Sequence, residues 1–328
     1  MTSEVWAALF GLAGSLVAGM FLIPSLRRLK IGQSIRSDGP QSHQTKAGTP
    51  TIGGLIFIIA APVATIAYYL ANGLPVNMPA ILLMAFPALY AVVGFIDDYR
   101  KVRKGRSLGL RAREKMALQI LFAAVFMVAV SYTGRGTEVI VPFTGTPVDL
   151  GVSYGIFGIL VIVSAGNGVN LTDGLDGLAT GTTLISLAAY WLIARQYSTL
   201  PNAPALSAPI MAWIGALFGF LCYNRHPAKV FMGDTGSNAL GALLAGIAIL
   251  TRTELVLILI AGVPVVETVS DILQVISFQL TGRRIFKMAP LHHHFELSGM
   301  SETAITWGFW AAQAVFALLG ILAMAYAG

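Results

Sequence analysis

The stretch N-G-V-N-L-T-D-G-L-D-G-L-A, residues 167–179, is short, polar and rich in glycine, and it carries Asp173 and Asp176. Almost unbroken apolar sequence lies on either side of it, over residues 152–165 and 178–194. A carboxylate at the centre of a membrane helix costs about 2.5–3.5 kcal/mol on insertion scales. We therefore expect both acids in a membrane-edge loop or a wet cavity, and we interpret this place as the working site. The alternative is a glycine-rich turn in which an Asp caps a helix.

The composition of the whole chain is that of a polytopic membrane protein. Of its 328 residues, 56% are hydrophobic and only 11% are charged, and the mean hydropathy is +0.75. Soluble domains carry roughly 25% charged residues. The single cysteine, Cys222, excludes a disulfide framework and a cysteine-based metal site. The first apolar run is followed by its basic residues and shows no small-residue cleavage site, so it reads as a span rather than a signal peptide.

Runs of about 20 apolar residues are candidate transmembrane helices. They predict an all-α membrane protein that forms a single domain over residues 1–328. Ten such runs are present: 5–24, 52–70, 78–96, 116–132, 152–165, 178–194, 205–223, 237–250, 255–280 and 304–327.

Lys and Arg cluster in two stretches, five in residues 27–46 and eight in residues 100–115. Basic runs poor in aromatic residues can bind nucleic acid, but between spans they are more typical of the cytoplasmic side. We therefore expect no nucleic-acid partner. If residues 27–51 are cytoplasmic, 18 of the 21 Lys and Arg lie in cytoplasmic loops. The positive-inside rule then predicts periplasmic termini and a cytoplasmic face that holds every cluster of carboxylates and histidines.

One outer loop differs from the others. Residues 137–150, T-E-V-I-V-P-F-T-G-T-P-V-D-L, alternate β-branched residues around a Thr-Gly-Thr turn. This pattern predicts a small periplasmic β-hairpin, to which we assign no chemistry.

The first cytoplasmic loop combines turn residues with hydrogen-bond donors. Its Gly and Pro residues set the loop geometry over residues 34–54, while Arg36, His43 and Lys46 supply donors. Such a loop suits phosphate oxygens, which cations and backbone N–H groups bind. The alternative is an ordinary solvated loop of the positive-inside kind.

The third apolar run ends at two adjacent carboxylates, Asp97 and Asp98, close to Lys101 and Lys104. Adjacent residues on a helix point about 100° apart, so we expect the helix to end there if both are to avoid lipid. Mg²⁺ takes one or two carboxylates and keeps phosphate oxygens and water, which fits this pattern. Helix capping explains the pair poorly, because an Asp near a helix C-terminus opposes the macrodipole.

A third acidic site follows the seventh run, in F-M-G-D-T-G-S, where Asp234 precedes a helix. An N-cap role is the alternative for Asp234, but a further acid on the same membrane face favours a metal. Phe231 is either ordinary packing or a platform for a base or sugar.

The ninth run carries Glu267, Asp271 and Gln274, whose spacing places them on one helical face. Pro264 predicts a break or kink before them. Polar groups beside a break at membrane depth indicate a cavity. The following P-L-H-H-H-F-E, residues 290–296, holds three adjacent histidines that cannot all face one ion from a regular helix, so hydrogen bonding to phosphate or sugar is favoured.

These motifs resemble the phospho-N-acetylmuramoyl-pentapeptide transferases, within the polyprenyl-phosphate N-acetylhexosamine-1-phosphate transferases, along the whole chain. The resemblance rests on S-D-G-P-x-x-H-x-x-K-x-G-T-P-T-x-G-G at 37–54, D-D-Y-x-K-V at 97–102, N-L-T-D-G-L-D-G-L-A at 170–179, F-M-G-D-T-G-S at 231–237 and P-L-H-H-H-F-E at 290–296. It implies transfer of phospho-MurNAc-pentapeptide from UDP-MurNAc-pentapeptide to undecaprenyl phosphate with Mg²⁺, at the cytoplasmic face of the bacterial inner membrane. It also implies a homodimer.

The resemblance further implies roles for individual residues. Asp234 is the leading Mg²⁺ ligand, Asp98 lies near the metal or its phosphates, and Asp97 orients or deprotonates the lipid phosphate. The catalytic set also includes His292, His293 and His294, which help to hold the phosphate or the muramoyl group. It implies contacts to phosphate or nucleotide for Lys46, Thr51, Lys101 and Lys115. It implies contacts to the uridine and sugar part of the nucleotide for Asn170, Asp173, Asp176, Asn224, Phe231 and Gln274.

Two other functions compete with this interpretation. A relative that uses UDP-GlcNAc shares the Asp-Asp and Gly-Asp-Thr-Gly-Ser patterns. A secondary transporter is the alternative from another class, because membrane acids often mark ion paths. The acids here crowd one membrane edge and the two halves show no internal repeat, which disfavours a transporter.

Overall fold

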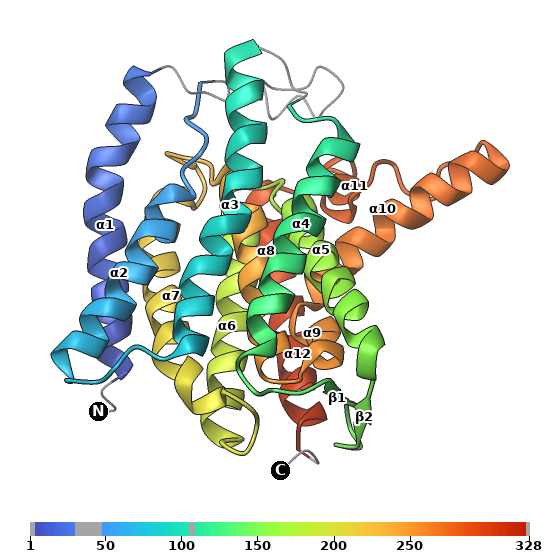
Figure 1. The fold of residues 1–328 in the computed structure, drawn as a ribbon. Coiled ribbons are helices and arrows are strands. Elements are labelled where there is room, and N and C mark those ends of the chain that lie inside the picture. Colours follow the sequence, from blue (N-terminus) through green and yellow to red (C-terminus); the bar gives the residue numbers. More distant parts are fainter. Residues whose placement is uncertain (1–3, 30–47, 105–108, 326–328) are drawn as a thin grey trace.

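The computed structural model describes residues 4–29, 48–104 and 109–325, and these residues are mostly helical (Figure 1). Each of the ten predicted apolar runs coincides with a helix, except that the ninth contains two. The elements are α1 (Glu4–Arg28), α2 (Leu55–Ala71), α3 (Met78–Lys104), α4 (Ala112–Ser131), β1 (Glu138–Ile140), β2 (Pro147–Asp149), a 3₁₀ turn (Gly151–Ser153), α5 (Tyr154–Thr172), α6 (Leu178–Gln196), α7 (Ala203–Asn224), α8 (Gly233–Leu250), α9 (Glu254–Ile260), α10 (Gly262–Thr281), α11 (Leu291–Glu296) and α12 (Glu302–Ala323).

Seven helices in the described part of the chain are long and apolar enough to cross a membrane: α1, α3, α4, α5, α7, α10 and α12. The apolar helix α2 is shorter, at 17 residues. The helix α8 begins with the polar stretch G-D-T-G-S-N, which lowers its hydropathy. A multi-pass membrane protein is therefore confirmed, whereas the count of ten spans stays a prediction.

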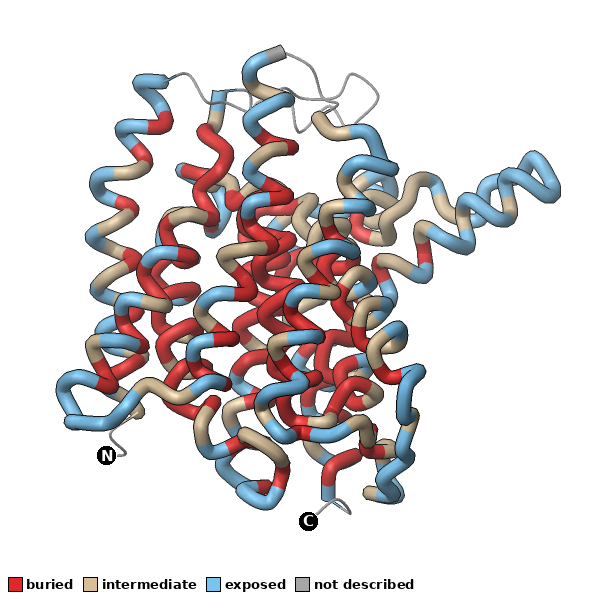
Figure 2. Tube along the Cα trace, viewed as in Figure 1, coloured by how far each residue is buried: buried red, intermediate tan, exposed pale blue. Residues whose placement is uncertain are grey.

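The helix α8 is the centre of the bundle. Every residue from Thr235 to Leu250 is buried (Figure 2). A helix that is apolar all round in this way belongs in a protein interior. Glycines let the neighbouring helices approach α8 closely. A Cβ atom at Gly94 of α3 would lie only 2.0 Å from the Asp234 carbonyl oxygen of α8. A Cβ atom at Gly241 of α8 would lie only 2.3 Å from the Ala165 carbonyl oxygen of α5. This close packing brings the end of α3 against the start of α8.

The predicted hairpin is present as the antiparallel pair β1 and β2, with Val139 opposite Val148. A buried ion pair between Arg135 and Glu254 (2.5 Å) ties the segment before β1 to α9. The Tyr154 hydroxyl also donates to Glu254 (2.6 Å). Figure 1 shows that the hairpin lies at the end of the bundle that holds the described ends of the chain.

The break or kink that Pro264 predicted in the ninth apolar run is present as a break: the run forms two helices, which meet at Ala261. Pro264 lies in the first turn of α10, where its missing N–H is tolerated. The buried Gln313 of α12 bonds both sides of the break: its amide donates to the Ile260 carbonyl (2.5 Å) and accepts from the Val263 N–H (3.0 Å). After the break, α10 leaves the bundle as an arm (Figure 1).

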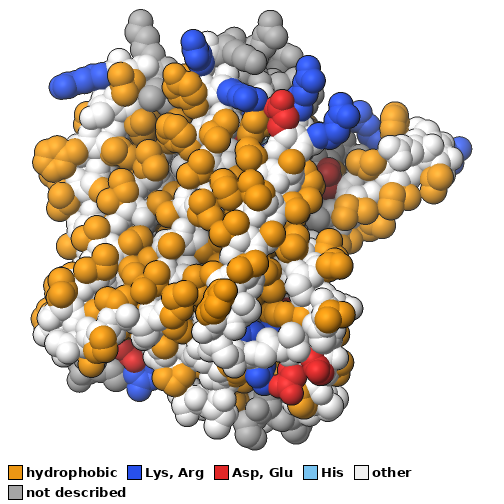
Figure 3. Space-filling model, viewed as in Figure 1, with side chains coloured by type: hydrophobic (Ala, Val, Ile, Leu, Met, Phe, Trp, Pro, Cys, Tyr) orange, Lys and Arg blue, Asp and Glu red, His pale blue; other side chains and the backbone are white. Residues whose placement is uncertain are grey.

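The surface separates into an apolar belt and two polar edges. Hydrophobic side chains cover the flank of the bundle, while most visible Lys and Arg side chains gather along the upper edge (Figure 3). The described chain ends and the hairpin lie at the opposite, lower edge (Figure 1). This distribution agrees with the asymmetry of basic residues along the sequence.

Candidate active site

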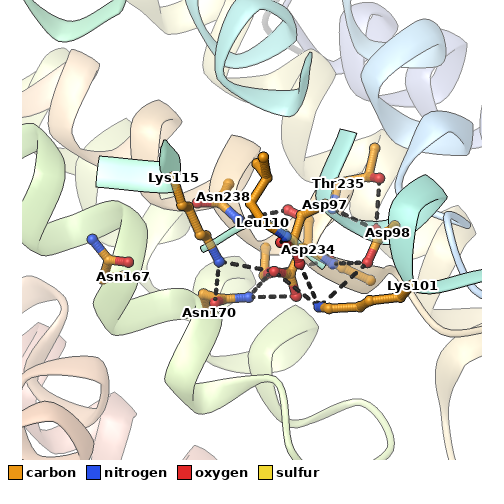
Figure 4. A network of polar contacts seen from close by, with 12 residues as sticks. Asp97, Asp98, Lys101, Leu110, Lys115, Asn167, Asn170, Asp234, Thr235 and Asn238 are labelled. Atoms are coloured by element: carbon orange, nitrogen blue, oxygen red, sulfur yellow. Dashed lines mark hydrogen bonds and ion pairs between the residues drawn. The ribbon is translucent and has the colours of Figure 1, made fainter. Parts of the chain in front are cut away.

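Three carboxylates from two helices meet at the polar upper part of the bundle. Asp97 and Asp98 come from α3, and Asp234 comes from the first turn of α8 (Figure 4). One oxygen of each lies within 4.8 Å of an oxygen of the other two. The structure thus brings together these three acids, although Asp98 and Asp234 are 136 positions apart in the sequence.

Two ammonium groups neutralise part of this acidic cluster. The Lys101 Nζ atom lies 2.6 Å from Asp97, 3.2 Å from Asp234 and 3.9 Å from Asp98, so it contacts all three carboxylates. The Lys115 Nζ atom of α4 lies 2.8 Å from Asp234 and donates to Asn170 of α5 (3.0 Å). Three formal negative charges thus face two positive ones.

Asp98 holds the N-terminus of α8. Its carboxylate accepts from the backbone N–H groups of Asp234 (3.2 Å) and Thr235 (2.9 Å), and from the Thr235 hydroxyl (2.8 Å). Carboxylates are stabilised at this end of a helix by the macrodipole and by unpaired N–H groups. Capping therefore does explain part of the Asp pair, but the helix that is capped is α8 and not α3.

Asp97 is buried by a segment that closes over it. The Leu110 N–H donates to Asp97 (2.6 Å), and a Cβ at Gly109 would lie 2.5 Å from the same carboxylate. The prediction that α3 ends at the Asp pair is wrong, since α3 continues to Lys104. Both acids avoid lipid because α8 covers one of them and residues 109–110 cover the other.

Asp234 does not cap its own helix. The N-cap position of α8 is Met232, and no side chain bonds there. The Asp234 oxygens instead accept from the Asn170 amide (3.1 Å) and from the two lysines. The Asp234 side chain is 17% exposed, compared with 5% for Asp97 and 4% for Asp98. Asp234 is therefore the most accessible carboxylate of the three.

A layer of amides beneath the carboxylates was missed by the sequence reasoning. Gln119 of α4 donates to Asn238 of α8 (2.9 Å) and accepts from Asn167 of α5 (3.1 Å), and Asn238 donates to the Asp234 carbonyl (2.8 Å). Gln119 and Asn238 are almost fully buried. Single polar residues inside apolar runs were the available signal, because such groups at membrane depth need partners.

Asp176 belongs to a second polar group. Its carboxylate accepts from the Ala228 N–H (3.0 Å) and lies 3.1 Å from His226 Nδ1, which is also 3.4 Å from Glu302. Glu302 in turn accepts from the Asp176 N–H (2.7 Å). Asp173 lies at the C-terminal cap of α5, three residues beyond Asn170. The stretch 167–179 thus connects the acidic cluster with this second group.

The structure shows partners for most of the other predicted residues. Asn224 is buried and bonds Thr180 (2.7 Å) and the Val230 carbonyl (3.1 Å). Phe231 pairs through its backbone with residues 50 and 53, next to the buried Thr51. The Gln274 side chain holds the backbone of Ile285 and Phe286. Lys46 lies outside the described residues.

The three histidines have three different partners. His292 Nδ1 lies 3.1 Å from Glu267, and His293 Nδ1 lies 2.7 Å from Glu296. His294 Nδ1 accepts from the Lys287 N–H (3.1 Å). The three imidazoles therefore face different groups. Within the described ranges, the groups that could hold a metal are the three Asp and the Asp176–His226–Glu302 set.

The three-Asp cluster offers the oxygen donors that a divalent cation binds. Mg²⁺ prefers oxygen ligands and uses few carboxylates, because it keeps water and phosphate oxygens. The Lys101 ammonium already occupies a cation position among the three carboxylates, at 2.6–3.9 Å from their oxygens. The donor set therefore fits a divalent cation.

Comparison with known proteins places this arrangement in a family. The pattern of Glycosyl transferase family 4 matches residues 79–252, which include all three Asp and both lysines. The phospho-N-acetylmuramoyl-pentapeptide-transferase of Desulforamulus reducens is 48% identical over 97% of this chain and 95% of its own length. Those of Bacillus subtilis and Heliobacterium modesticaldum are each 47% identical, over 97% and 98% of this chain and 96% and 98% of their own lengths.

The chain belongs to the phospho-N-acetylmuramoyl-pentapeptide-transferase family. A match of this extent confirms the resemblance seen in the motifs. It also favours this family over the sister transferases that use UDP-GlcNAc, because the relatives cover almost the whole chain and share one name. The Asp–Lys cluster of this family member is thus a candidate active site for transfer of a phospho-sugar.

Proposed function

We propose that the protein transfers phospho-MurNAc-pentapeptide from UDP-MurNAc-pentapeptide to undecaprenyl phosphate, with release of UMP and formation of lipid I. The observation that carries the proposal is the cluster of three Asp and two Lys side chains in a member of this transferase family. Such a set can neutralise and position phosphates, which is most of what phosphoryl transfer requires.

The same proposal includes an orientation in the bacterial inner membrane. The Lys- and Arg-rich edge, with the acidic cluster near it, faces the cytoplasm by the positive-inside rule. The termini and the hairpin then lie in the periplasm. A cytoplasmic site is accessible to a soluble nucleotide and to a lipid phosphate at the membrane edge, so both substrates can meet there. We also propose that the protein acts as a homodimer.

The chemistry is a displacement at the β-phosphorus of the nucleotide. An oxygen of the lipid phosphate forms a bond to this phosphorus, and the bond to the bridging oxygen breaks, so that UMP leaves with that oxygen. Asp97 orients the lipid phosphate or takes its proton. Lys101 and Lys115 bind phosphate oxygens and offset their charge. Asp98 keeps the start of α8 in place, so that Asp234 stays between the two lysines.

Asp234 and Asp98 are the residues that would hold Mg²⁺. The cation supplies charge neutralisation for the diphosphate. We assign substrate contacts to the remaining predicted residues, with the uridine and sugar part proposed near the second polar group and the phosphates near the lysines. These are Asn170, Asp173, Asp176, Asn224, Phe231, Gln274, Thr51 and Lys46, together with His292, His293 and His294.

The test is UMP release by detergent-solubilised protein from UDP-MurNAc-pentapeptide, with undecaprenyl phosphate and Mg²⁺, for wild type and Asp234→Ala. We expect release that requires lipid, metal and Asp234. Release only with UDP-GlcNAc would assign the protein to the sister branch. No release with either nucleotide from a folded sample would overturn the transferase proposal. A phospho-enzyme trapped without lipid would replace one-step transfer with a two-step route.

A further inference from the structure

A fully buried acid on α10 lies against the first histidine of α11. Glu267 has no exposed surface and His292 is 1% exposed. The Glu267 carboxylate lies 3.1 Å from His292 Nδ1. In this geometry the Nδ1–H group donates to the carboxylate, because a carboxylate can only accept.

The other two polar atoms of this pair are unpartnered. Glu267 Oε1 and His292 Nε2 are both buried and have no hydrogen-bond partner among the residues that the structure describes. A buried polar group without a partner costs about 1–3 kcal/mol. Two apolar side chains of the same size would avoid this cost. Packing alone therefore does not explain why Glu267 and His292 are buried here.

The unpartnered nitrogen points at the stretch that joins the two polar groups. A Cβ added at Gly174 would lie 2.1 Å from His292 Nε2 and 2.7 Å from Cε1. Gly174 lies between Asp173 and Leu175, four residues after Asn170, which contacts Asp234. Only a glycine there lets the imidazole edge reach the loop backbone.

The neighbouring histidines show that the arrangement is specific to His292. His293 also faces a carboxylate, but its partner Glu296 lies on the same short helix. His294 accepts at Nδ1 from a backbone N–H, so its Nε2 carries the proton. His292, by contrast, is paired with a buried acid from another helix, Glu267, which sets the tautomer and the direction of the ring.

We propose that Glu267 is a positioning residue that holds His292 as the Nδ1–H tautomer with Nε2 directed at the Asp173–Asp176 loop. There the unprotonated Nε2 accepts a hydrogen bond from a hydroxyl or amide N–H group of the sugar part of the nucleotide when the Gly174 backbone moves off it. This inference rests on the proposed function of the site. The α9–α10 break directs α10 so that Glu267 faces inward, which gives that break a role in the site.

The first test measures the tautomer and needs no activity. The full-length protein is labelled with ¹⁵N-histidine in detergent at pH 8.5, and the His292 signals are assigned by their loss in His292→Asn. Wild type should show a protonated Nδ1 and an unprotonated Nε2. Glu267→Gln can donate to Nδ1, so it should shift the proton to Nε2, whereas Asp271→Asn on the same helix should not. A Nε2–H tautomer in wild type, or signals unchanged by Glu267→Gln, would overturn the proposal.

The second test is a double-mutant cycle on UMP release. A carboxylate that orients a metal-ligating histidine typically contributes about 10- to 100-fold, and we expect a similar range for Glu267. We expect Glu267→Gln and His292→Asn each to lower kcat by about that factor at an unchanged melting temperature, and the double variant to lose no more than the worse single one. Multiplied losses would show that Glu267 acts independently of His292 and would overturn the proposal.

A third variant tests the role of Nε2 without substituting Glu267 or His292. Gly174→Ala leaves Glu267 and His292 intact but puts a methyl group against Nε2, so it should lower kcat as well; an unchanged kcat would contradict the role of Nε2. If wild type itself releases no UMP, the proposed function fails, while the ¹⁵N measurement still decides whether Glu267 sets the tautomer.

Discussion

At the residue scale, the carboxylates of the cluster differ in the groups that they contact. Asp98 is occupied by N–H and hydroxyl donors of α8, whereas Asp234 faces amines and an amide and is more exposed. Asp98 and Asp234 therefore differ in their bonding partners and in their exposure. We propose that Asp98 anchors the start of α8 in addition to lying beside the cation, and that Asp234 contacts the cation and the phosphates more directly.

This division predicts different losses for two substitutions. Asp98→Ala removes the acceptor for three donors, so it should destabilise the protein by about 1–3 kcal/mol and lower its melting temperature as well as its activity. Asp234→Asn should lower UMP release by about 10²- to 10³-fold, because charge stabilisation is lost, with little change in melting temperature. Activity assays and thermal unfolding in detergent measure both, with the exposed Asp149→Asn of the hairpin as control. Equal destabilisation by the two variants would contradict the division.

Lys101 predicts a second effect, on metal affinity. Its ammonium contacts all three carboxylates, so a divalent cation must displace it. An ion pair at a partly exposed position contributes up to about 1 kcal/mol. Lys101→Met should therefore bind Mn²⁺ about 2- to 5-fold more tightly without nucleotide, as measured by the loss of the free Mn²⁺ resonance signal, yet bind nucleotide more weakly. The exposed Lys229→Met is the matched control, and weaker Mn²⁺ binding by Lys101→Met would contradict the expectation.

Sequence reasoning found the members of this site but not their partners. Chemistry-bearing residues stand out in apolar sequence because their burial is costly, which is how Asp97, Asp98 and Asp234 were found. Which donor each acid meets depends on how α3 crosses α8, and no local spacing encodes that crossing. Gln119 and Asn238 were missed for a related reason, since amides carry no charge and stand out less from an apolar run.

At the element scale, the α9–α10 break shows where local sequence stops being sufficient. Pro264 predicted a break or kink, and the polar face formed by Glu267, Asp271 and Gln274 predicted which side of the helix lines a cavity. The break itself falls earlier, at Ala261 between Ile260 and Gly262, where Gln313 of a distant helix satisfies the backbone. Free backbone groups at membrane depth require such a partner.

Gln313 therefore predicts a stability effect at this junction. Gln313→Leu leaves the Ile260 carbonyl with only the Ser186 hydroxyl and leaves the Val263 N–H unpaired, so it should cost about 1–3 kcal/mol. Thermal unfolding in detergent measures the loss, with the exposed Val315→Ala of the same helix as control. If Gln313→Leu is as stable as this control, Gln313 does not support the break.

At the scale of the whole molecule, two independent asymmetries agree. Along the sequence, Lys and Arg concentrate in alternate loops, and in space they gather on the edge opposite the hairpin and the described chain ends. The acidic cluster lies where α3 nears that basic edge. The packing alone would be the same in either orientation, since it contains no information about which side is the cytoplasm. Orientation is therefore the part of the architecture that depends most on charge.

The orientation predicts which loops a reagent outside the cell can reach. In a Cys222→Ser background, Thr144→Cys lies exposed at the hairpin turn and Arg283→Cys lies exposed just beyond α10. A membrane-impermeant maleimide added to spheroplasts should label Thr144→Cys and leave Arg283→Cys unlabelled until the membrane is permeabilised. The opposite pattern would put the acidic cluster outside, where no cytoplasmic nucleotide could reach it, and would exclude the proposed reaction. Labelling of both sites before permeabilisation, with an intracellular marker still protected, would contradict the separation of the two edges by the membrane.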